Sequence, residues 1–185
     1  GTGKISKLIK DQNNEVYGVE VNPIAAAEAQ TLGIRVKIFD LSEGIPFEDE
    51  GFDFVHAGAV LEYIYDTRFF MEECNRVLKP GGILLFSTNN MNSLKNRIGV
   101  LTGRFPKNLG AFPEDYSGAH FRVFNVEKVK ELCRFAGFSP LQILGAPDKP
   151  ARGFTGRIMA PVSLLRPQFG EVLLVRARKV SHPVC

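Results

Sequence analysis

The chain has 185 residues, a length typical of one domain of ordinary size. Hydrophobic residues make up 44% and charged residues 23%, values near the globular average that exclude a disordered or fibrous chain. The three cysteines and three histidines are scattered without metal-ligand spacing, which excludes a disulfide scaffold and a metalloenzyme and fits a reducing compartment. The sequence shows neither a membrane-spanning apolar run nor a signal peptide, so we expect a cytoplasmic protein.

Charge is divided unevenly along the chain. Residues 1–90 carry a net charge of −6 and residues 91–185 carry +9, which leaves +3 for the whole. A basic half is typical of a protein that meets an anionic substrate, a membrane surface or nucleic acid, although an ordinary solvated basic face is the alternative. No helix-turn-helix signature and no basic stretch interleaved with aromatic residues indicates nucleic acid.

Helical and extended patterns alternate along the chain, which predicts an α/β fold with a mostly parallel sheet and helices on both faces. The predicted helices cover residues 4–12, 24–32, 66–78 and 126–136. The predicted strands cover residues 16–21, 34–39, 52–57, 83–87, 138–144 and 171–179. Two irregular insertions lie at about 89–125 and 145–170. We expect one domain, 1–185, in which these insertions form the site for the molecule on which the protein acts.

The first predicted helix is preceded only by Gly1-Thr2-Gly3. A glycine loop that binds phosphate or nucleoside normally joins a strand to such a helix, so we expect that the usual first strand is absent and the chain starts within that loop. Glu20 ends the next strand, 17 residues after Gly3, near the separation expected for an acid that binds ribose hydroxyls. An ordinary exposed acid at a strand end is the alternative. Ser6 stands where a dinucleotide fingerprint needs its third glycine, which disfavours a nicotinamide-dependent dehydrogenase.

Short motifs follow one another along nearly the whole chain. They are GTG at 1–3, GVEVN at 18–22, FDL at 39–41, IPF at 45–47, GFDFV at 51–55, VLEYI at 60–64, RVLKPGG at 76–82, LLFST at 84–88, HFRVF at 120–124 and AGF at 136–138. In this order and spacing they resemble the class I S-adenosylmethionine (SAM)-dependent methyltransferases. The resemblance implies a Rossmann-like fold and an enzyme that transfers the methyl group of SAM without a metal, leaving S-adenosylhomocysteine.

The resemblance also assigns residues to the cofactor. Glu20 would hold the ribose, and Asp40 would meet the adenine amino group, while the next backbone amide meets a ring nitrogen. The predicted cofactor-binding residues are Gly1, Thr2, Gly3, Glu20, Val21, Asp40, Leu41, Ala57 and Gly58. Glycine lets the backbone approach the methionine end of SAM closely. Acids suit the sugar and the adenine of this cofactor, which also carries a sulfonium cation.

The sequence signals are less specific for the residues that contact the methyl acceptor. His120 is the candidate general base because it ends the first insertion and titrates near neutrality, with a structural histidine as the alternative. Tyr63, Asn89 and Asn90 are predicted to bind the acceptor, or else to pack and form a turn. In-line methyl transfer needs mainly alignment and exclusion of water, so a base is required only if the acceptor must lose a proton.

Residues 91–110 carry four basic residues and no acid. Their apolar residues fit a short amphipathic helix that would cover the pocket or touch a membrane peripherally; a solvated helix is the alternative. We therefore expect a small-molecule acceptor, anionic, lipid-linked or sugar-linked, and no nucleic acid. A SAM-binding scaffold that transfers nothing is the alternative function.

Overall fold

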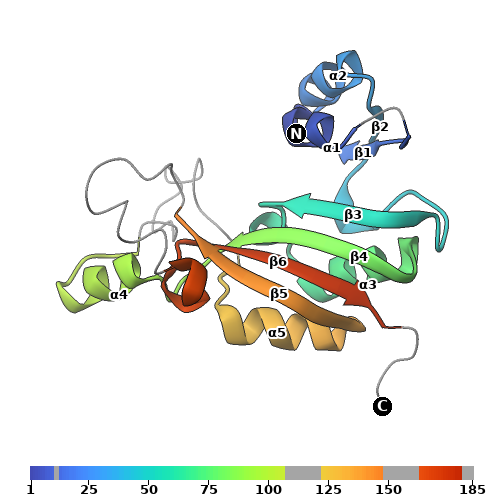
Figure 1. The fold of residues 1–185 in the computed structure, drawn as a ribbon. Helices are drawn as coiled ribbons and strands as arrows, with labels where there is room; N and C mark the ends of the chain where they lie inside the picture. The colour runs from blue at the N-terminus through green and yellow to red at the C-terminus, as the bar shows by residue number, and fades with distance from the viewer. Residues whose placement is uncertain (11–12, 107–121, 148–162, 181–185) are drawn as a thin grey trace. The chain divides into compact units, whose positions relative to one another are not determined.

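Local sequence signals divide the chain into the helices and strands drawn in Figure 1. The computed structural model describes residues 1–10, 13–106, 122–147 and 163–180. These residues fall into two compact units, Gly1–Glu48 and Asp49–Cys185, and each is described by itself. The organisation as one domain with two insertions stays a prediction.

A parallel two-stranded sheet forms the centre of the unit Gly1–Glu48. The elements are α1 (Lys4–Ile9), β1 (Tyr17–Glu20), α2 (Pro23–Thr31), β2 (Arg35–Ile38) and the 3-10 turn η1 (Leu41–Glu43). Parallel strands need a crossover connection, which α2 supplies. Asn22 begins α2, because its side chain accepts a hydrogen bond from the Ile24 amide at 2.9 Å and Pro23 occupies the first helical position.

A four-stranded mixed sheet forms the centre of the unit Asp49–Cys185, with strand order β3-β4-β6-β5. In chain order its elements are β3 (Phe52–Gly58), the turn η2 (Leu61–Tyr63), α3 (Thr67–Val77), β4 (Leu78–Asn89), α4 (Leu94–Leu101), α5 (Val126–Phe135), β5 (Phe138–Ala146), the turn η4 (Pro167–Phe169) and β6 (Val172–Lys179). β3 and β4 are parallel, whereas β6 runs antiparallel to both of its neighbours. The α/β fold is therefore confirmed.

Residues 79–82, which separate a predicted helix from a predicted strand, lie inside a longer strand. Phe52 pairs with Leu78 and Phe54 pairs with Ile83, so the four residues between the two pairs bulge out of the ladder. Gly81 adopts φ 76°, in the left-handed region that glycine tolerates. β4 consequently begins immediately after α3, five residues earlier than the pattern of apolar residues indicates.

Apolar faces of two helices and two strands make the core of this unit. The fully buried side chains include Met71 and Cys74 of α3 and Val129 of α5, each 0% exposed. β4 and β6 alternate buried and more exposed residues, as strands covered mainly on one face do. Figure 1 shows α3 and α5 beside this sheet, and the two helices also contact each other.

Candidate functional site

Gly3 occupies a position that only glycine fills without strain. Its φ is 77°, and a Cβ added there would lie 2.6 Å from Ile34 Cδ1 and 2.9 Å from Ala29 Cβ. Gly3 is also the residue before α1, and its carbonyl accepts a hydrogen bond from the Lys7 amide at 2.8 Å. The backbone of the glycine segment therefore packs directly against α2 and the start of β2.

Glu20 lies where the glycine segment meets the end of β1. Its Oε1 accepts a hydrogen bond from the Asn22 amide at 2.8 Å, and its Oε2 contacts the Gly1 amino group. Partial burial raises the pKa of Glu20, but the hydrogen bonds from the Gly1 amino group and from the Asn22 and Val21 amides outweigh it and lower that pKa overall. The structure thus brings Gly1 and an ionised Glu20 together.

Asp40 lies at the same sheet edge as Glu20. In the parallel register Glu20 pairs with Ile38, and the Phe39 amide donates to the Glu20 carbonyl at 3.3 Å, so both acids follow the carboxyl ends of neighbouring strands. Asp40 is exposed, and its Oδ1 accepts a hydrogen bond from the Ser42 amide at 2.8 Å. Hydrogen bonds from the Ser42 amide and hydroxyl lower the pKa of Asp40, which keeps it anionic.

This edge offers hydrogen-bond acceptors of the kind that the predicted nucleoside site requires. A carboxylate at a strand end, with lone pairs beyond its bond to Asn22, can accept hydrogen bonds from ribose hydroxyls. Val21 is 63% exposed beside it, and Leu41 directly follows the second acid. Thr2 lies between the two glycines and is partly exposed. We find no group of three or more His, Cys, Asp or Glu arranged for a metal in the part of the chain that the structure describes.

Ala57 and Gly58 end β3 in the other unit. Ala57 is 4% exposed, whereas Gly58 is exposed and a Cβ there would lie 3.0 Å from the His56 ring. Ala59 follows with φ 51°, and its amide donates to Ser87 Oγ at 3.0 Å. An alanine in the left-handed region indicates a constrained turn at the carboxyl end of this strand. The contact of Ala57 and Gly58 with a cofactor stays a prediction.

Glu62 is a buried acid to which the sequence analysis assigned no role. It is 1% exposed in η2, and its Oε1 accepts hydrogen bonds from the Asn89 amide at 2.8 Å and from Asn89 Nδ2 at 3.3 Å. Its Oε2 is buried without a hydrogen-bond partner among the described residues. The available signal was a charged residue between Leu61 and Ile64, in an apolar segment directly after a strand. Glu62 ties the turn after β3 to the end of β4.

Asn90 is buried and makes backbone contacts rather than facing solvent. It is 2% exposed, and its Nδ2 donates to the Gly170 carbonyl at 2.7 Å and to the Gln168 carbonyl at 3.1 Å. Its Oδ1 accepts from the Asn92 amide at 3.0 Å. These bonds favour the turn-forming alternative for Asn90, while Asn89 remains partly exposed.

Of the remaining predicted site residues, Tyr63 lies within the described part of the chain and His120 does not. The Tyr63 side chain is 51% exposed in η2, next to Glu62. Nearby, Arg122 donates from its amide to the Glu62 carbonyl at 3.3 Å and from Nε to the Tyr65 carbonyl at 2.9 Å. The segment that starts at Arg122 therefore lies against the turn after β3. His120 lies outside the described residues, so its role stays a prediction.

Comparison with known proteins identifies the family. Residues 1–86 match the methyltransferase domain family. A probable S-adenosylmethionine-dependent methyltransferase of Mycolicibacterium smegmatis is 33% identical over 147 residues, which cover 78% of this chain and 51% of that protein. A demethylmenaquinone methyltransferase of Staphylococcus haemolyticus is 29% identical over 63% of this chain and 49% of its own length. The chain spans about half the length of these curated relatives.

Solved structures show the same fold. A SAM-dependent methyltransferase of Thermotoga maritima, described as a possible histamine N-methyltransferase, superposes with a TM-score of 0.68 at 24% identity, over 97% of this chain and 78% of that one. A SAM-dependent methyltransferase of Methanosarcina mazei gives a TM-score of 0.67 at 20% identity, over 98% and 90%. Motifs, family match and fold agree, and the chain belongs to the class I SAM-dependent methyltransferases.

Proposed function

We propose that the protein containing this chain transfers the methyl group of SAM to a small acceptor. The observation that carries the proposal is the edge of the β1–β2 sheet, where Gly3 packs against α2 and the ionised carboxylate of Glu20 faces the glycine segment. When bound there, SAM would supply an electrophilic methyl group on a sulfonium, and its loss leaves the neutral thioether of S-adenosylhomocysteine.

The residues of the chain would contribute binding and alignment. Glu20 would accept hydrogen bonds from the ribose hydroxyls, and Asp40 would accept one from the adenine amino group. We propose Ala57 and Gly58 as further cofactor-binding residues, and Tyr63 and Asn89 as residues that contact the acceptor. If the acceptor must lose a proton, we propose His120 as the base that takes it.

We further propose an acceptor that is anionic, lipid-linked or sugar-linked. The net charge of +9 on residues 91–185 supports it, and so do relatives whose names include a quinone. These are the demethylmenaquinone methyltransferase and a ubiquinone biosynthesis O-methyltransferase of Mus musculus, which is 26% identical over 65% of this chain and 32% of its own length. Peripheral membrane contact through residues 91–110 belongs to the same proposal. The buried free thiols of Cys74 and Cys133 support a cytoplasmic location.

A SAM-binding protein that transfers nothing to an acceptor is the second candidate. The [4+2]-cyclase SpnF shares the fold, with a TM-score of 0.64 at 19% identity over 98% of this chain and 72% of that one. This fold alone therefore does not determine the reaction.

Calorimetric titration of S-adenosylhomocysteine into the full-length protein tests the cofactor site. We expect Glu20→Ala to weaken binding by roughly tenfold to a hundredfold, because one or two charge-assisted hydrogen bonds are lost. Glu28→Ala is the matched control, since Glu28 is an exposed acid on α2 of the same unit. Equal affinity of the two variants would mean that the ribose lies elsewhere. Binding without methyl transfer to any acceptor would favour the second candidate.

A further inference from the structure

One end of the unit Asp49–Cys185 exposes large apolar side chains from two segments. Leu101 at the end of α4 is 86% exposed, and Leu165, shortly before η4, is 82% exposed. Further apolar side chains that are 51–65% exposed on these segments are Ile98, Val100, Phe105 and Leu164. A single exposed leucine is ordinary, but several on neighbouring segments indicate an interaction surface.

The two segments are held together by specific contacts. Lys95 Nζ lies 3.0 Å from Glu171 Oε2, and the Arg97 guanidinium lies 5.5 Å from the centroid of the Phe169 ring. Asn90 Nδ2 adds its 2.7 Å hydrogen bond to the Gly170 carbonyl. Figure 1 shows α4 next to the short helical turn that precedes β6. We call the exposed side chains of residues 98–105 and 164–166 the α4 surface.

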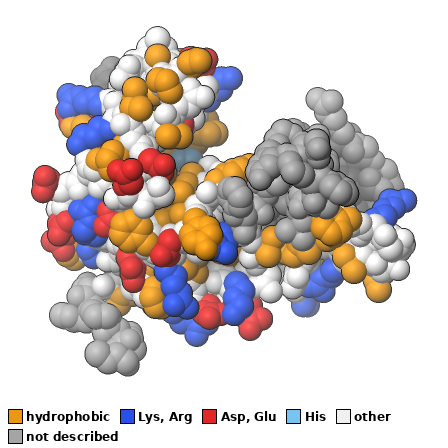
Figure 2. All heavy atoms as spheres, turned by 180° about the vertical axis from the view of Figure 1, so that it is seen from behind, with side chains coloured by type: hydrophobic (Ala, Val, Ile, Leu, Met, Phe, Trp, Pro, Cys, Tyr) orange, Lys and Arg blue, Asp and Glu red, His pale blue; other side chains and the backbone are white. Residues whose placement is uncertain are grey.

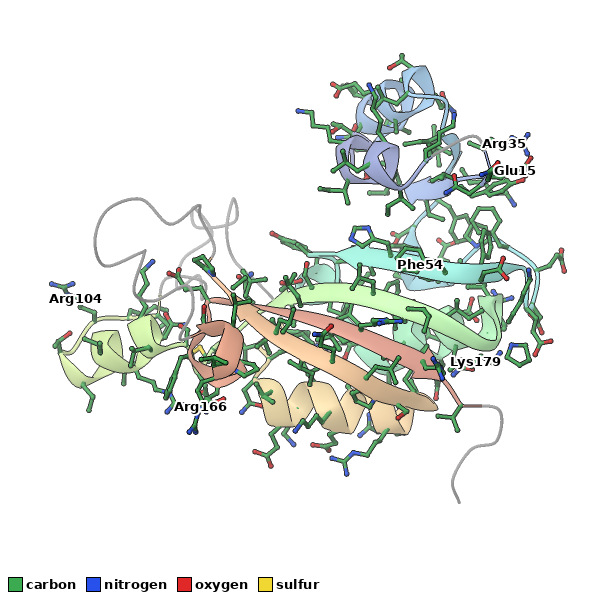
Figure 3. The ribbon with its side chains drawn as sticks, in the orientation of Figure 1. Glu15, Arg35, Phe54, Arg104, Arg166 and Lys179 are labelled. Carbon is green, nitrogen blue, oxygen red and sulfur yellow. The ribbon has the colours of Figure 1, made fainter. Side chains whose placement is uncertain are left out.

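Basic residues outnumber acidic ones in this region. Residues 91–106 and 163–171 contain four basic residues, Lys95, Arg97, Arg104 and Arg166, and one acid, Glu171, which pairs with Lys95. Arg104 and Arg166 are exposed, and Figure 3 shows both at the end of the unit where α4 lies. Figure 2, which views the molecule from behind, shows hydrophobic and basic side chains intermixed at this end. Exposed apolar side chains with arginines among them match the headgroup and acyl layers of an anionic membrane.

We propose that the α4 surface binds the interface of a lipid bilayer that contains anionic lipids. Leu101 and Leu165 enter the boundary between headgroups and acyl chains, while Arg104 and Arg166 contact the phosphates. Leu101 and Leu165 are each more than four-fifths exposed, at 86% and 82%, and a fluid bilayer accepts such protruding groups without a matching shaped pocket. Among the residues that the structure describes, no helix has the length and apolar character of a membrane span.

This inference deepens the proposed function, because a protein held at a bilayer meets a lipid-linked acceptor there. Membrane binding is nevertheless measured without SAM and without an acceptor. Vesicle binding with no affinity for S-adenosylhomocysteine would overturn the proposed function and leave the surface standing. Cofactor binding with no affinity for vesicles would overturn the surface alone.

Vesicle co-sedimentation of the full-length protein is the test. The probes are vesicles of phosphatidylcholine mixed with phosphatidylglycerol, and vesicles of phosphatidylcholine alone. We expect Leu101→Glu and Leu165→Glu each to lower partitioning to the mixed vesicles by roughly tenfold. Leu141→Glu is the matched control, because Leu141 is an exposed leucine of β5, 44% exposed, outside the α4 surface. Replacing both Arg104 and Arg166 with Gln should lower partitioning to the mixed vesicles by about tenfold, and the remaining partitioning should depend less on salt concentration.

Three results would overturn the proposal. The first is equal binding to both kinds of vesicle, which would remove the role of the arginines. The second is an equal loss in Leu141→Glu, which would mean that any exposed leucine matters. The third is light scattering that shows self-association abolished by Leu101→Glu, which would identify a second copy of the chain as the partner. Circular dichroism confirms that each variant is folded before its binding is compared.

Discussion

Replacing Glu62 tests whether a buried carboxylate holds the ends of β3 and β4 together. Alanine at this position removes the acceptor of the Asn89 amide, which then loses its 2.8 Å hydrogen bond in a partly buried place. An unsatisfied buried donor costs about 1–3 kcal/mol, and the space left by a side chain that is 1% exposed adds about 1 kcal/mol. We therefore expect Glu62→Ala to lower the free energy of unfolding by about 2–4 kcal/mol and the melting temperature by about 5–15 °C.

Glutamine at the same position separates the hydrogen bond from the charge. Its Oε1 can still accept from the Asn89 amide and side chain, while a neutral amide nitrogen replaces the unpartnered Oε2. Because the acceptor of the Asn89 amide is kept, we expect Glu62→Gln to stay within about 1 kcal/mol of the original protein.

Urea denaturation followed by circular dichroism measures both effects. Glu72→Ala is the control, because Glu72 is an exposed acid of α3. Two results would refute the reasoning. A loss below about 1 kcal/mol in Glu62→Ala would mean that the carboxylate does not anchor Asn89. Equal losses in the alanine and glutamine variants would mean that the charge, rather than the hydrogen bond, stabilises the turn.

Three further changes test other parts of the structure. Gly3→Ala places a Cβ 2.6 Å from Ile34 Cδ1 at positive φ, so we expect a loss of about 1–3 kcal/mol in a thermal melt; an unchanged melt would contradict the close packing. Asn90→Ala removes the donor to the Gly170 carbonyl and should cost about 2 kcal/mol in urea denaturation, whereas a cost under about 0.5 kcal/mol would show that the loop holds without it. Burial lowers the pKa of His56, so the unfolded chain takes up a proton more readily. Stability should therefore fall as pH drops below about 6.5, and His56→Gln should flatten this slope; an identical slope would assign it to other groups.

Local sequence signals predicted most of the secondary structure because they act over a few residues. Asn22-Pro23 and Asn125 both begin helices where the pattern indicates, since a short polar side chain satisfies the first free amides of a helix. The predicted strand 171–179 corresponds to β6 within one residue. The recurrence of familiar motifs at familiar spacing also identified the family before any coordinates.

Part of the candidate site was equally readable from the sequence. Gly3 precedes α1, Glu20 ends β1 and Asp40 follows β2. Parallel strands bring their carboxyl ends to one edge, so the neighbourhood of the two acids follows from chain order. Their contacts with a cofactor rest on the family resemblance.

Long-range contacts decided what no local pattern encodes. The placement of β6 between β4 and β5 depends on ladders between residues about ninety positions apart, such as Leu84 with Ala177. Glu62 and Asn90 are an acid and an amide in ordinary turns by sequence, and only tertiary packing buries them and fixes their partners. The sequence by itself determined the elements and the family, because these depend on neighbours along the chain. The tertiary structure alone decided strand order, the burial of Glu62 and the pairing of α4 with η4, because those depend on which distant segments exclude water together.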